Sequence, residues 1–436
     1  MPVDYETAAP PAAAPAPAPP PAAKRKIVFF GVFGVQNIGN ECTLEAIVQN
    51  ARKRLPGGEF FAVSYKTDDT AERHKMPAIP VSLQDFTGVK RRGGLRGKFE
   101  KLLRVLRRVP DEINDWRASL RVLRDADMLI MTGTGMLTDY MTTATGYPYD
   151  IFRWTGAARL AGCKVAFVGV GAGPIYGNMS KRLLRRALGR AEFRSFRDEN
   201  SRDRIRRIGF ENAKDYIFPD LAWSLDPAMF PQNANRKRPR RRVGLGVMDH
   251  RDIHGWTDEE HRARYENYLN TMCEFVVWLV EHNYSVRILQ GDAKNDAATR
   301  GELRARLQKR GIDYEKAGII DEGAKTVGEL IAQIGDADIV VSPRFHNLLL
   351  GLMMSIPAVS ISYDPKTDIL LEGVGLGKYC QPIEEVDLDR LIGHFTELES
   401  RGDSVKPLIE AKAAEYRALL DEEYNLLFGG FQSPAR

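Results

Sequence analysis

The side chains best suited to chemistry are Arg344 and His346, two residues apart in the run Ser342-Pro343-Arg344-Phe345-His346. Arginine suits bidentate binding of a carboxylate or phosphate, and histidine exchanges a proton near neutral pH. An apolar strand pattern at 338–342 precedes the run and an apolar helical pattern follows it. A helix N-terminus attracts anions. The position therefore predicts an anion site with a proton-exchanging group. The alternative is a capping histidine beside a solvated arginine.

Two further charged residues follow short strand patterns. Arg197 precedes Asp198 and Glu199, which suit the first turn of a helix. Helix capping accounts for the two carboxylates but not for Arg197, so an anion-binding role and a capping role are both open. Asp220 follows Phe218-Pro219 and is interpreted either as a general base or as a turn cap.

The segment 362–366, Ser-Tyr-Asp-Pro-Lys, is another polar stretch after a strand pattern. Its Tyr363 and Asp364 are either site residues or parts of an ordinary Asp-Pro turn. Glycines also cluster after strand patterns, where the backbone can approach a ligand closely; they are Gly31, Gly34, Gly39, Gly133, Gly135, Gly169, Gly171 and Gly173. None of these clusters matches G-x-G-x-x-G or the P-loop, so a nucleotide is not indicated. Tight turns are the alternative.

The elements that position these residues alternate between strand and helix. Strand patterns lie at 27–30, 60–65, 128–131 and 164–170, and again at 243–248, 285–289, 338–342 and 358–362, with helical patterns between them. Such alternation predicts parallel sheets covered on both faces. The fold class is therefore α/β, with two Rossmann-like domains facing a cleft.

Composition sets the expected domain boundaries. Residues 1–24 are almost all Ala and Pro and predict a disordered tail. An N-terminal domain at 25–232 and a C-terminal domain at 243–406 are joined by a basic linker at 233–242. The last helix, within 407–436, is expected to pack back onto the first half.

Charge and cysteine usage exclude several classes of protein. The net charge of +5 over 436 residues makes no case for nucleic-acid binding. Four dispersed cysteines without a CxxC pair argue against a zinc knuckle or a disulfide scaffold. No apolar run could span a bilayer and no signal pattern opens the chain, so a cytoplasmic location is expected. Residues 90–108 predict either a basic helix in peripheral contact with the inner membrane surface or a core helix with a solvated basic face.

Four blocks in order resemble the polysaccharide pyruvyl transferase family. Residues 31–41 are similar to a family opening G-x-x-G-x-x-N-x-G-D-E, and 127–135 to an apolar strand ending in a glycine string. The third block is 169–174 with 194–199, and the fourth is 344–346 with 362–366. Asn40 replaces a common aspartate, and Thr134 and Met136 interrupt the glycine string. These departures lie on the side where the acceptor is expected.

The resemblance implies a fold like that of GT-B glycosyltransferases, with phosphoenolpyruvate as donor and a sugar or lipid-linked oligosaccharide as acceptor. It makes the C-terminal domain the donor side and assigns donor binding to Arg344, together with Arg197 of the N-terminal domain. It assigns catalysis to His346. Candidate acceptor or supporting residues are Asn37, Asn40, Glu41, Gly133, Gly135, Asp220, Tyr363 and Asp364.

The chemistry expected from these residues is ketal formation on two sugar hydroxyls, in cell-surface polysaccharide assembly. No cofactor or metal is expected, because the sequence has no visible ligand cluster. Two other functions stay open. One is a GT-B glycosyltransferase that uses a nucleotide sugar, and the other is a non-catalytic sugar-binding relative.

Overall fold

The computed structural model describes residues 25–83, 95–140, 142–231, 238–250, 257–292 and 295–431, without the side chains of 95–108, 258 and 431. The expected tail at 1–24 and residues 233–237 of the expected linker lie outside this part of the chain. So do residues 90–94 of the expected basic helix and the side chains of its remainder.

The first lobe is built on a parallel sheet of seven strands in the order β3-β2-β1-β4-β5-β6-β7. The strands are β1 (Lys26–Phe30), β2 (Glu59–Ser64), β3 (Ala78–Pro80), β4 (Met128–Thr132), β5 (Lys164–Val170), β6 (Phe193–Phe196) and β7 (Asp215–Ile217). The central strands are apolar along their length because helices bury both faces of the sheet.

The second lobe has a parallel sheet of six strands in the order β10-β9-β8-β11-β12-β13. They are β8 (Arg242–Gly246), β9 (Ser285–Leu289), β10 (Ile319–Ile320), β11 (Ile339–Ser342), β12 (Ala358–Ser362) and β13 (Cys380–Pro382). The linker expected at 233–242 includes the first residue of β8. Arg242 begins β8, since its backbone N–H donates to Asp338 (2.7 Å) and its guanidinium pairs with Asp336.

Helices connect the strands of both lobes. In the first lobe they are α1 (Ile38–Arg54), α2 (Thr67–His74), α3 (Leu95–Leu123), α4 (Tyr147–Ala161), α5 (Asn178–Leu188) and α6 (Glu199–Arg207). In the second they are α7 (Asp258–Glu281), α8 (Asp296–Lys309), α9 (Tyr314–Ala317), α10 (Val327–Gly335), α11 (Phe345–Met353), α12 (Pro365–Gly373) and α13 (Leu388–Ser400). Short 3-10 turns are η1 (Leu221–Ser224), η2 (Pro227–Met229), η3 (Gly377–Tyr379), η4 (Ile383–Glu385) and η5 (Gly429–Phe431).

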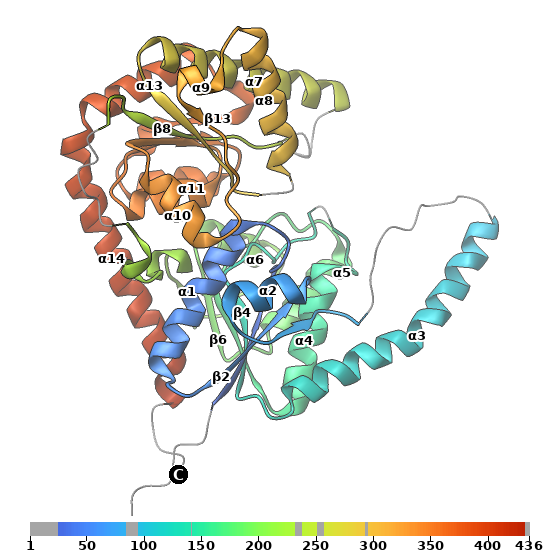
Figure 1. Cartoon of the computed structure of the whole chain (residues 1–436). Helices are drawn as coiled ribbons and strands as arrows, with labels where there is room; N and C mark the ends of the chain where they lie inside the picture. The colour runs from blue at the N-terminus through green and yellow to red at the C-terminus, as the bar shows by residue number, and fades with distance from the viewer. Residues whose placement is uncertain are drawn as a thin grey trace, which may run out of the picture.

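The last helix, α14 (Gly402–Phe428), runs along both lobes (Figure 1). It begins five residues before Pro407, where the prediction started it. Proline removes one backbone hydrogen bond, and the helix continues through it. On the first lobe Asp421 pairs with Arg54 (2.8 Å) and Tyr424 hydrogen-bonds Ser224 (2.9 Å). α14 thus ties the end of the chain to the first lobe.

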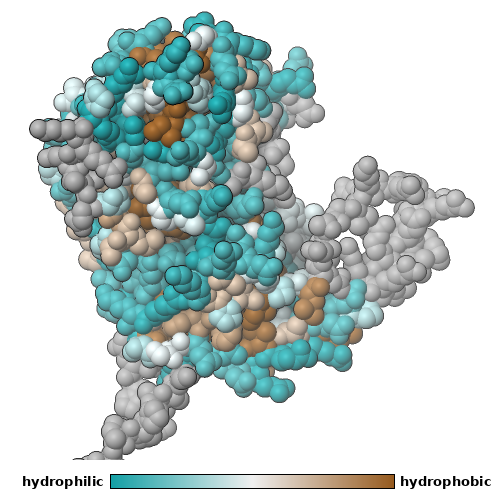
Figure 2. Space-filling model, in the orientation of Figure 1, coloured by the Kyte–Doolittle hydropathy of each residue, from teal (hydrophilic) through white to brown (hydrophobic). Residues whose placement is uncertain are grey.

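The two lobes face each other across the carboxyl ends of their strands, with α1 against α10 and α11 (Figure 1). One cluster of buried apolar side chains includes residues of both sheets, so the lobes share a continuous core. Hydrophilic residues cover most of the face in Figure 2, with hydrophobic residues in small patches between them. Among the described residues no helix is long and apolar enough to cross a membrane. The α/β prediction with two facing Rossmann-like domains is confirmed.

Candidate active site

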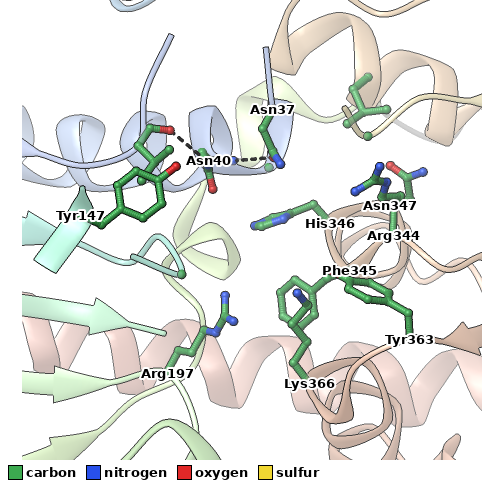
Figure 3. A pocket seen from close by; sticks show the side chains of 15 residues that line it. Asn37, Asn40, Tyr147, Arg197, Arg344, Phe345, His346, Asn347, Tyr363 and Lys366 are labelled. Carbon is green, nitrogen blue, oxygen red and sulfur yellow. Dashed lines mark hydrogen bonds between the residues drawn. The ribbon is translucent and has the colours of Figure 1, made fainter. Parts of the chain in front are cut away.

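A cavity of about 230 Å³ lies between the lobes where their strands end (Figure 3). Loops and helix starts of both lobes supply its walls. The first lobe contributes Val32, Asn37, Gly39, Asn40, Gly135, Tyr147 and Arg197, and the second contributes Gly291, Leu330, Arg344, Phe345, His346, Asn347, Tyr363 and Lys366. The structure thus brings Arg197, Arg344 and His346 into one cavity.

Arg344 is held from behind by a carboxylate. It is the N-cap residue of α11, and its backbone N–H donates to Ser342 Oγ (3.0 Å). Its guanidinium pairs with the fully buried Asp296, whose other oxygen accepts the N–H groups of Gly291 (3.0 Å) and Asp292 (2.8 Å). Burial opposes the charge of Arg344, but Asp296 outweighs it and raises the arginine pKa above its ordinary value. The cavity therefore holds a fixed positive charge.

Arg197 enters the cavity from the opposite side, just after β6. Its guanidinium lies 3.6 Å from Asp220 and 3.3 Å from Asp198, and it sits 5.4 Å from the centre of the Phe345 ring. Burial opposes its charge, whereas Asp220 and Asp198 raise its pKa. Asp198 also caps α6 through the N–H of Ser201 (2.6 Å). The two interpretations of this segment coexist, because the carboxylate caps the helix while the arginine lines the cavity.

His346 lies in the first turn of α11, between the two arginines (Figure 3). Its Nε2 is 3.8 Å from Asp220 Oδ1, across the junction of the lobes. Asp220 is 4% exposed and also accepts the Ala222 N–H (3.0 Å) as the cap of η1. Burial raises the Asp220 pKa, but His346 and Arg197 outweigh burial and hold it below its ordinary value. An ionised Asp220 thus faces both a proton-exchanging imidazole and a guanidinium.

Three glycines leave room for the side chains of Arg197, Arg344 and His346. A Cβ on Gly171 would lie 2.7 Å from Arg197 Cζ, and one on Gly291 would lie 2.8 Å from Arg344 Cγ. A Cβ on Gly39 would lie 2.2 Å from His346 Nδ1. All three distances are shorter than real Cβ contacts. Any larger residue would displace the side chain that it faces.

The start of α1 joins the lobes beside the cavity. Asn37 caps α1 by accepting the Asn40 N–H (3.3 Å), and its Nδ2 lies 3.5 Å from Asp292 of the second lobe. The Ile38 N–H donates to the Gly291 carbonyl (3.1 Å). Asn40 donates to the Val32 carbonyl (2.9 Å) and lines the cavity. α1 begins at Ile38, because Asn37 supplies the cap.

Three other candidate residues lie outside the cavity walls. Glu41 is buried, accepts the Gly34 N–H (2.9 Å) and contacts His74 Nε2 (2.9 Å). Gly133 allows close packing, since a Cβ there would lie 2.8 Å from the Gly169 carbonyl oxygen. Asp364 caps α12 through the Lys366 N–H (3.0 Å). All three support the site from behind. Gly135 and Tyr363 do line the cavity.

Sequence reasoning did not single out Tyr147, Asn347 and Lys366, which also line the cavity. Lys366 adds a positive charge and lies 4.6 Å from the centre of the Tyr363 ring. Its signal was present, as a lysine at a strand end next to two candidates. Tyr147 begins α4 after Gly146 and belongs to no recognised block. Asn347 is oriented by Ser342 Oγ (3.3 Å).

A buried carboxyl group lies behind the cavity on α14. Glu423 contacts Ser195 Oγ, and that hydroxyl accepts the Gly169 N–H (2.7 Å). Burial raises the Glu423 pKa to about 8. The described residues contain no group of three or more His, Cys, Asp or Glu side chains that could hold a metal ion. The cavity walls are suited to binding a small anion and exchanging protons with it.

The fold places the chain among GT-B-like α/β proteins. It is similar to a glycosyltransferase from Rickettsia africae (TM-score 0.59, 10% identity, 95% of this chain and 100% of that one). It is also similar to sucrose-phosphate synthase from Thermosynechococcus elongatus (0.56, 12%, 93% and 100%). A UDP-GlcNAc 2-epimerase from Neisseria meningitidis, bound to UDP-GlcNAc, is a third (0.51, 11%, 92% and 100%). At these identities the likeness concerns the fold alone.

A family comparison is more specific. The sequence profile of the family described as polysaccharide pyruvyl transferase matches residues 37–365, most of the chain. The chain therefore belongs to the polysaccharide pyruvyl transferase family and is a transferase, which confirms the resemblance seen in the sequence. A search of curated protein sequences gives no match.

Proposed function

We propose that this protein transfers the pyruvyl group of phosphoenolpyruvate onto two hydroxyls of one sugar, forming a cyclic ketal during cell-surface polysaccharide assembly. The observation that carries the proposal is the set of basic side chains around one small cavity, namely Arg197, Arg344 and Lys366, with His346 between the arginines. Phosphoenolpyruvate carries a carboxylate and a phosphate on one three-carbon unit. A small cavity with cations on opposite walls suits such a compact anion.

In this proposal Arg344 and Arg197 bind the carboxylate and phosphate of the donor, and Lys366 adds charge on the second-lobe side. The carboxylates behind the arginines fix their direction, so that little side-chain order has to be gained on binding. Asp220 and Asp296 are absent from the cavity lining, and the donor therefore meets the cations first.

The proton chemistry is assigned to His346. Its imidazolium protonates the methylene carbon of the donor, and the cationic carbon C2 is attacked by one sugar hydroxyl. Phosphate then leaves with its bridging oxygen, and the second hydroxyl attacks C2 to close the ketal. One hydroxyl proton restores the imidazolium that gave its proton to the new methyl group, and the other ends on phosphate. Asp220 Oδ1 lies 3.8 Å from His346 Nε2, across the lobe junction.

The acceptor is assigned to the first-lobe side of the cavity. Asn37, Asn40 and Gly135 line that side, and a sugar there would face His346. Holding two hydroxyls against one carbon supplies much of the rate, because the second attack becomes intramolecular. We further propose that the acceptor is lipid-linked and that the reaction takes place in the cytoplasm, at the inner membrane surface.

The test is phosphate release from phosphoenolpyruvate, with nitrophenyl and lipid-linked sugars as acceptors and product mass as the second readout. The ketal product gains the mass of pyruvate less one water. His346→Ala is expected to abolish release, a loss of at least about a thousandfold. The matched control is His282→Ala, an exposed histidine at the end of α7, which should leave the rate unchanged. Unchanged release by His346→Ala would overturn the role of this histidine.

The nucleotide-sugar alternative is separated by a thermal-shift comparison. Phosphoenolpyruvate is expected to raise the melting temperature through the two arginines, and UDP-sugars are expected to have no effect. Stabilisation by UDP-glucose or UDP-GlcNAc, without stabilisation by phosphoenolpyruvate, would favour glycosyl transfer instead. Binding of sugars without any release of phosphate would favour a non-catalytic relative.

A further inference from the structure

A second and larger depression adjoins the cavity in the first lobe. It has a volume of about 1250 Å³ and shares Tyr147 with the smaller cavity. We call it the acidic groove, because six carboxyl groups line it: Asp68, Asp69, Asp111, Glu112, Asp115 and Asp150. The helices α2, α3 and α4 supply these groups.

The charge of the acidic groove is opposite to that of the cavity. Among the described residues its basic lining consists of Lys66 and Arg153, so carboxylates outnumber cations. Arg153 is 2% exposed and lies 3.5 Å from Asp115 and 3.4 Å from Asp150. An anion such as phosphoenolpyruvate would be repelled here, and so would an acidic glycan.

The acidic groove is also lined by aromatic side chains. Tyr65 is 37% exposed, its ring centre lies 5.8 Å from that of Tyr147, and its hydroxyl donates to Asp150 (3.1 Å). Tyr149 lies close by, with its hydroxyl donating to Glu112 (2.5 Å). Tyrosine rings offer an apolar face next to polar atoms. Rings beside fixed acceptor oxygens match a pyranose, which has an apolar C–H face and a rim of hydroxyls.

One buried donor in the groove still lacks an acceptor. The Nε–H of Arg153 is buried and has no hydrogen-bond acceptor among the described residues, and a carboxylate oxygen of Glu112 lies 3.9 Å from the nitrogen. Leaving a buried charged donor without an acceptor is costly. A ring or hydroxyl oxygen of a bound sugar would satisfy it.

We propose that the acidic groove binds uncharged sugar residues of the acceptor glycan, beyond the sugar that receives the pyruvyl group. The proposal rests on the proposed function, because it extends the acceptor from the cavity past Tyr147. The carboxylates accept hydrogen bonds from hydroxyls, Tyr65 packs against a sugar face, and Arg153 donates from the floor. The groove thus selects neutral oligosaccharides by length and excludes acidic ones.

The first experiment measures binding without donor. Saturation-transfer NMR is applied to maltotetraose, cellotetraose, tetra-N-acetylchitotetraose and tetragalacturonate, with their monosaccharides for comparison. At least one neutral tetrasaccharide is expected to bind more tightly than its monosaccharide, and tetragalacturonate is expected not to bind. Tyr65→Ala should weaken that binding about tenfold. The matched control is Tyr216→Ala, a tyrosine 40% exposed on β7, which should leave binding unchanged.

Absence of neutral tetrasaccharide binding would overturn the proposal, as would equal binding of tetragalacturonate or an unaltered affinity in Tyr65→Ala. The second experiment uses an acceptor found active in the phosphate-release test. Lengthening it should lower KM in the wild type but not in Tyr65→Ala, with kcat similar in both. If glycans bind as expected but no phosphate is released, the proposed function fails and the groove remains a glycan site. If phosphate is released but the length effect is missing, the groove proposal fails alone.

Discussion

The cavity and the acidic groove share Tyr147, and each contains an ion pair between an arginine and a carboxylate. The two sites differ in which partner lies nearer the opening. In the cavity, Arg344 faces the opening and the buried Asp296 lies behind it. In the acidic groove, Asp150 is the more exposed partner, and the buried Arg153 lies against it. An ion pair between arginine and carboxylate can thus build either an anion site or a site for neutral hydroxyls. The partner that faces the opening determines which ligand is attracted.

The largest effect is expected from breaking the ion pair of the cavity. Arg344→Ala removes a cation that is proposed to bind the donor, and it leaves Asp296 buried without its partner. We expect kcat/KM for phosphoenolpyruvate to fall about a thousandfold and the unfolding free energy to fall by about 3 kcal/mol. Phosphate release and urea denaturation measure the two effects.

A double variant separates the loss of activity from the loss of stability. Arg344→Met with Asp296→Asn removes both charges, and it should recover most of the stability but none of the activity. Arg306→Ala, which breaks an exposed ion pair with Glu266 (2.7 Å), serves as the control and should change neither quantity appreciably. Normal donor kinetics in Arg344→Ala would show that the cavity is not the anion site.

A tenfold effect is expected from crowding Arg197. In Gly171→Ala the new methyl group would meet the guanidinium, which must then shift from its position beside Asp220. We expect kcat/KM for phosphoenolpyruvate to fall about tenfold, while neutral glycan binding is retained. Gly301→Ala is the control, since a Cβ in that part of α8 meets nothing within 4 Å. Equal activity in the two variants would remove Arg197 from the donor site.

The last effect is on stability alone and concerns the charge of the acidic groove. Burial, with Glu112 nearby, raises the pKa of Asp150 to about 6, above the value of about 4 in an unfolded chain. The folded state therefore keeps a proton that the unfolded state releases, and this contribution to stability is lost as pH rises from about 4 to about 6. Relative to Asp150→Asn, the wild type should lose about 2 kcal/mol of unfolding free energy between pH 4 and pH 7.

Urea denaturation at both pH values measures this difference. Asp125→Asn changes the same charge at an exposed position between α3 and β4 and should show almost no difference between pH 4 and pH 7. A pH-independent difference between Asp150→Asn and the wild type would mean that Asp150 is as well solvated as an exposed aspartate.

The sequence predicted the parts of the site that follow from residues next to one another in the chain. Pro343 marks the end of a strand, and this local signal alone places Arg344 and His346 at a helix start. Arg197 could be located in the same way, after a short strand pattern. Strand and helix alternation also predicted both sheets, because parallel strands in α/β proteins are apolar along their whole length.

The sequence could not predict which polar side chains turn toward the cavity. Asn40 and Glu41 are adjacent in α1, but one residue rotates a helix by about 100°, so Asn40 lines the cavity while Glu41 contacts His74. Tyr147 reaches the cavity from the start of α4, away from any recognised block. Ser195 and Glu423 are 228 residues apart, and no local pattern links them.

The contact between His346 and Gly39 has a consequence for the timing of the reaction. The imidazole belongs to one lobe, while the glycine it packs on and the carboxylate of Asp220 belong to the other. If the lobes swing apart, His346 loses both neighbours in one movement. If the proposed function holds, an open molecule would admit substrates without reacting with them, and phosphoenolpyruvate would be protected from hydrolysis until a sugar is enclosed with it.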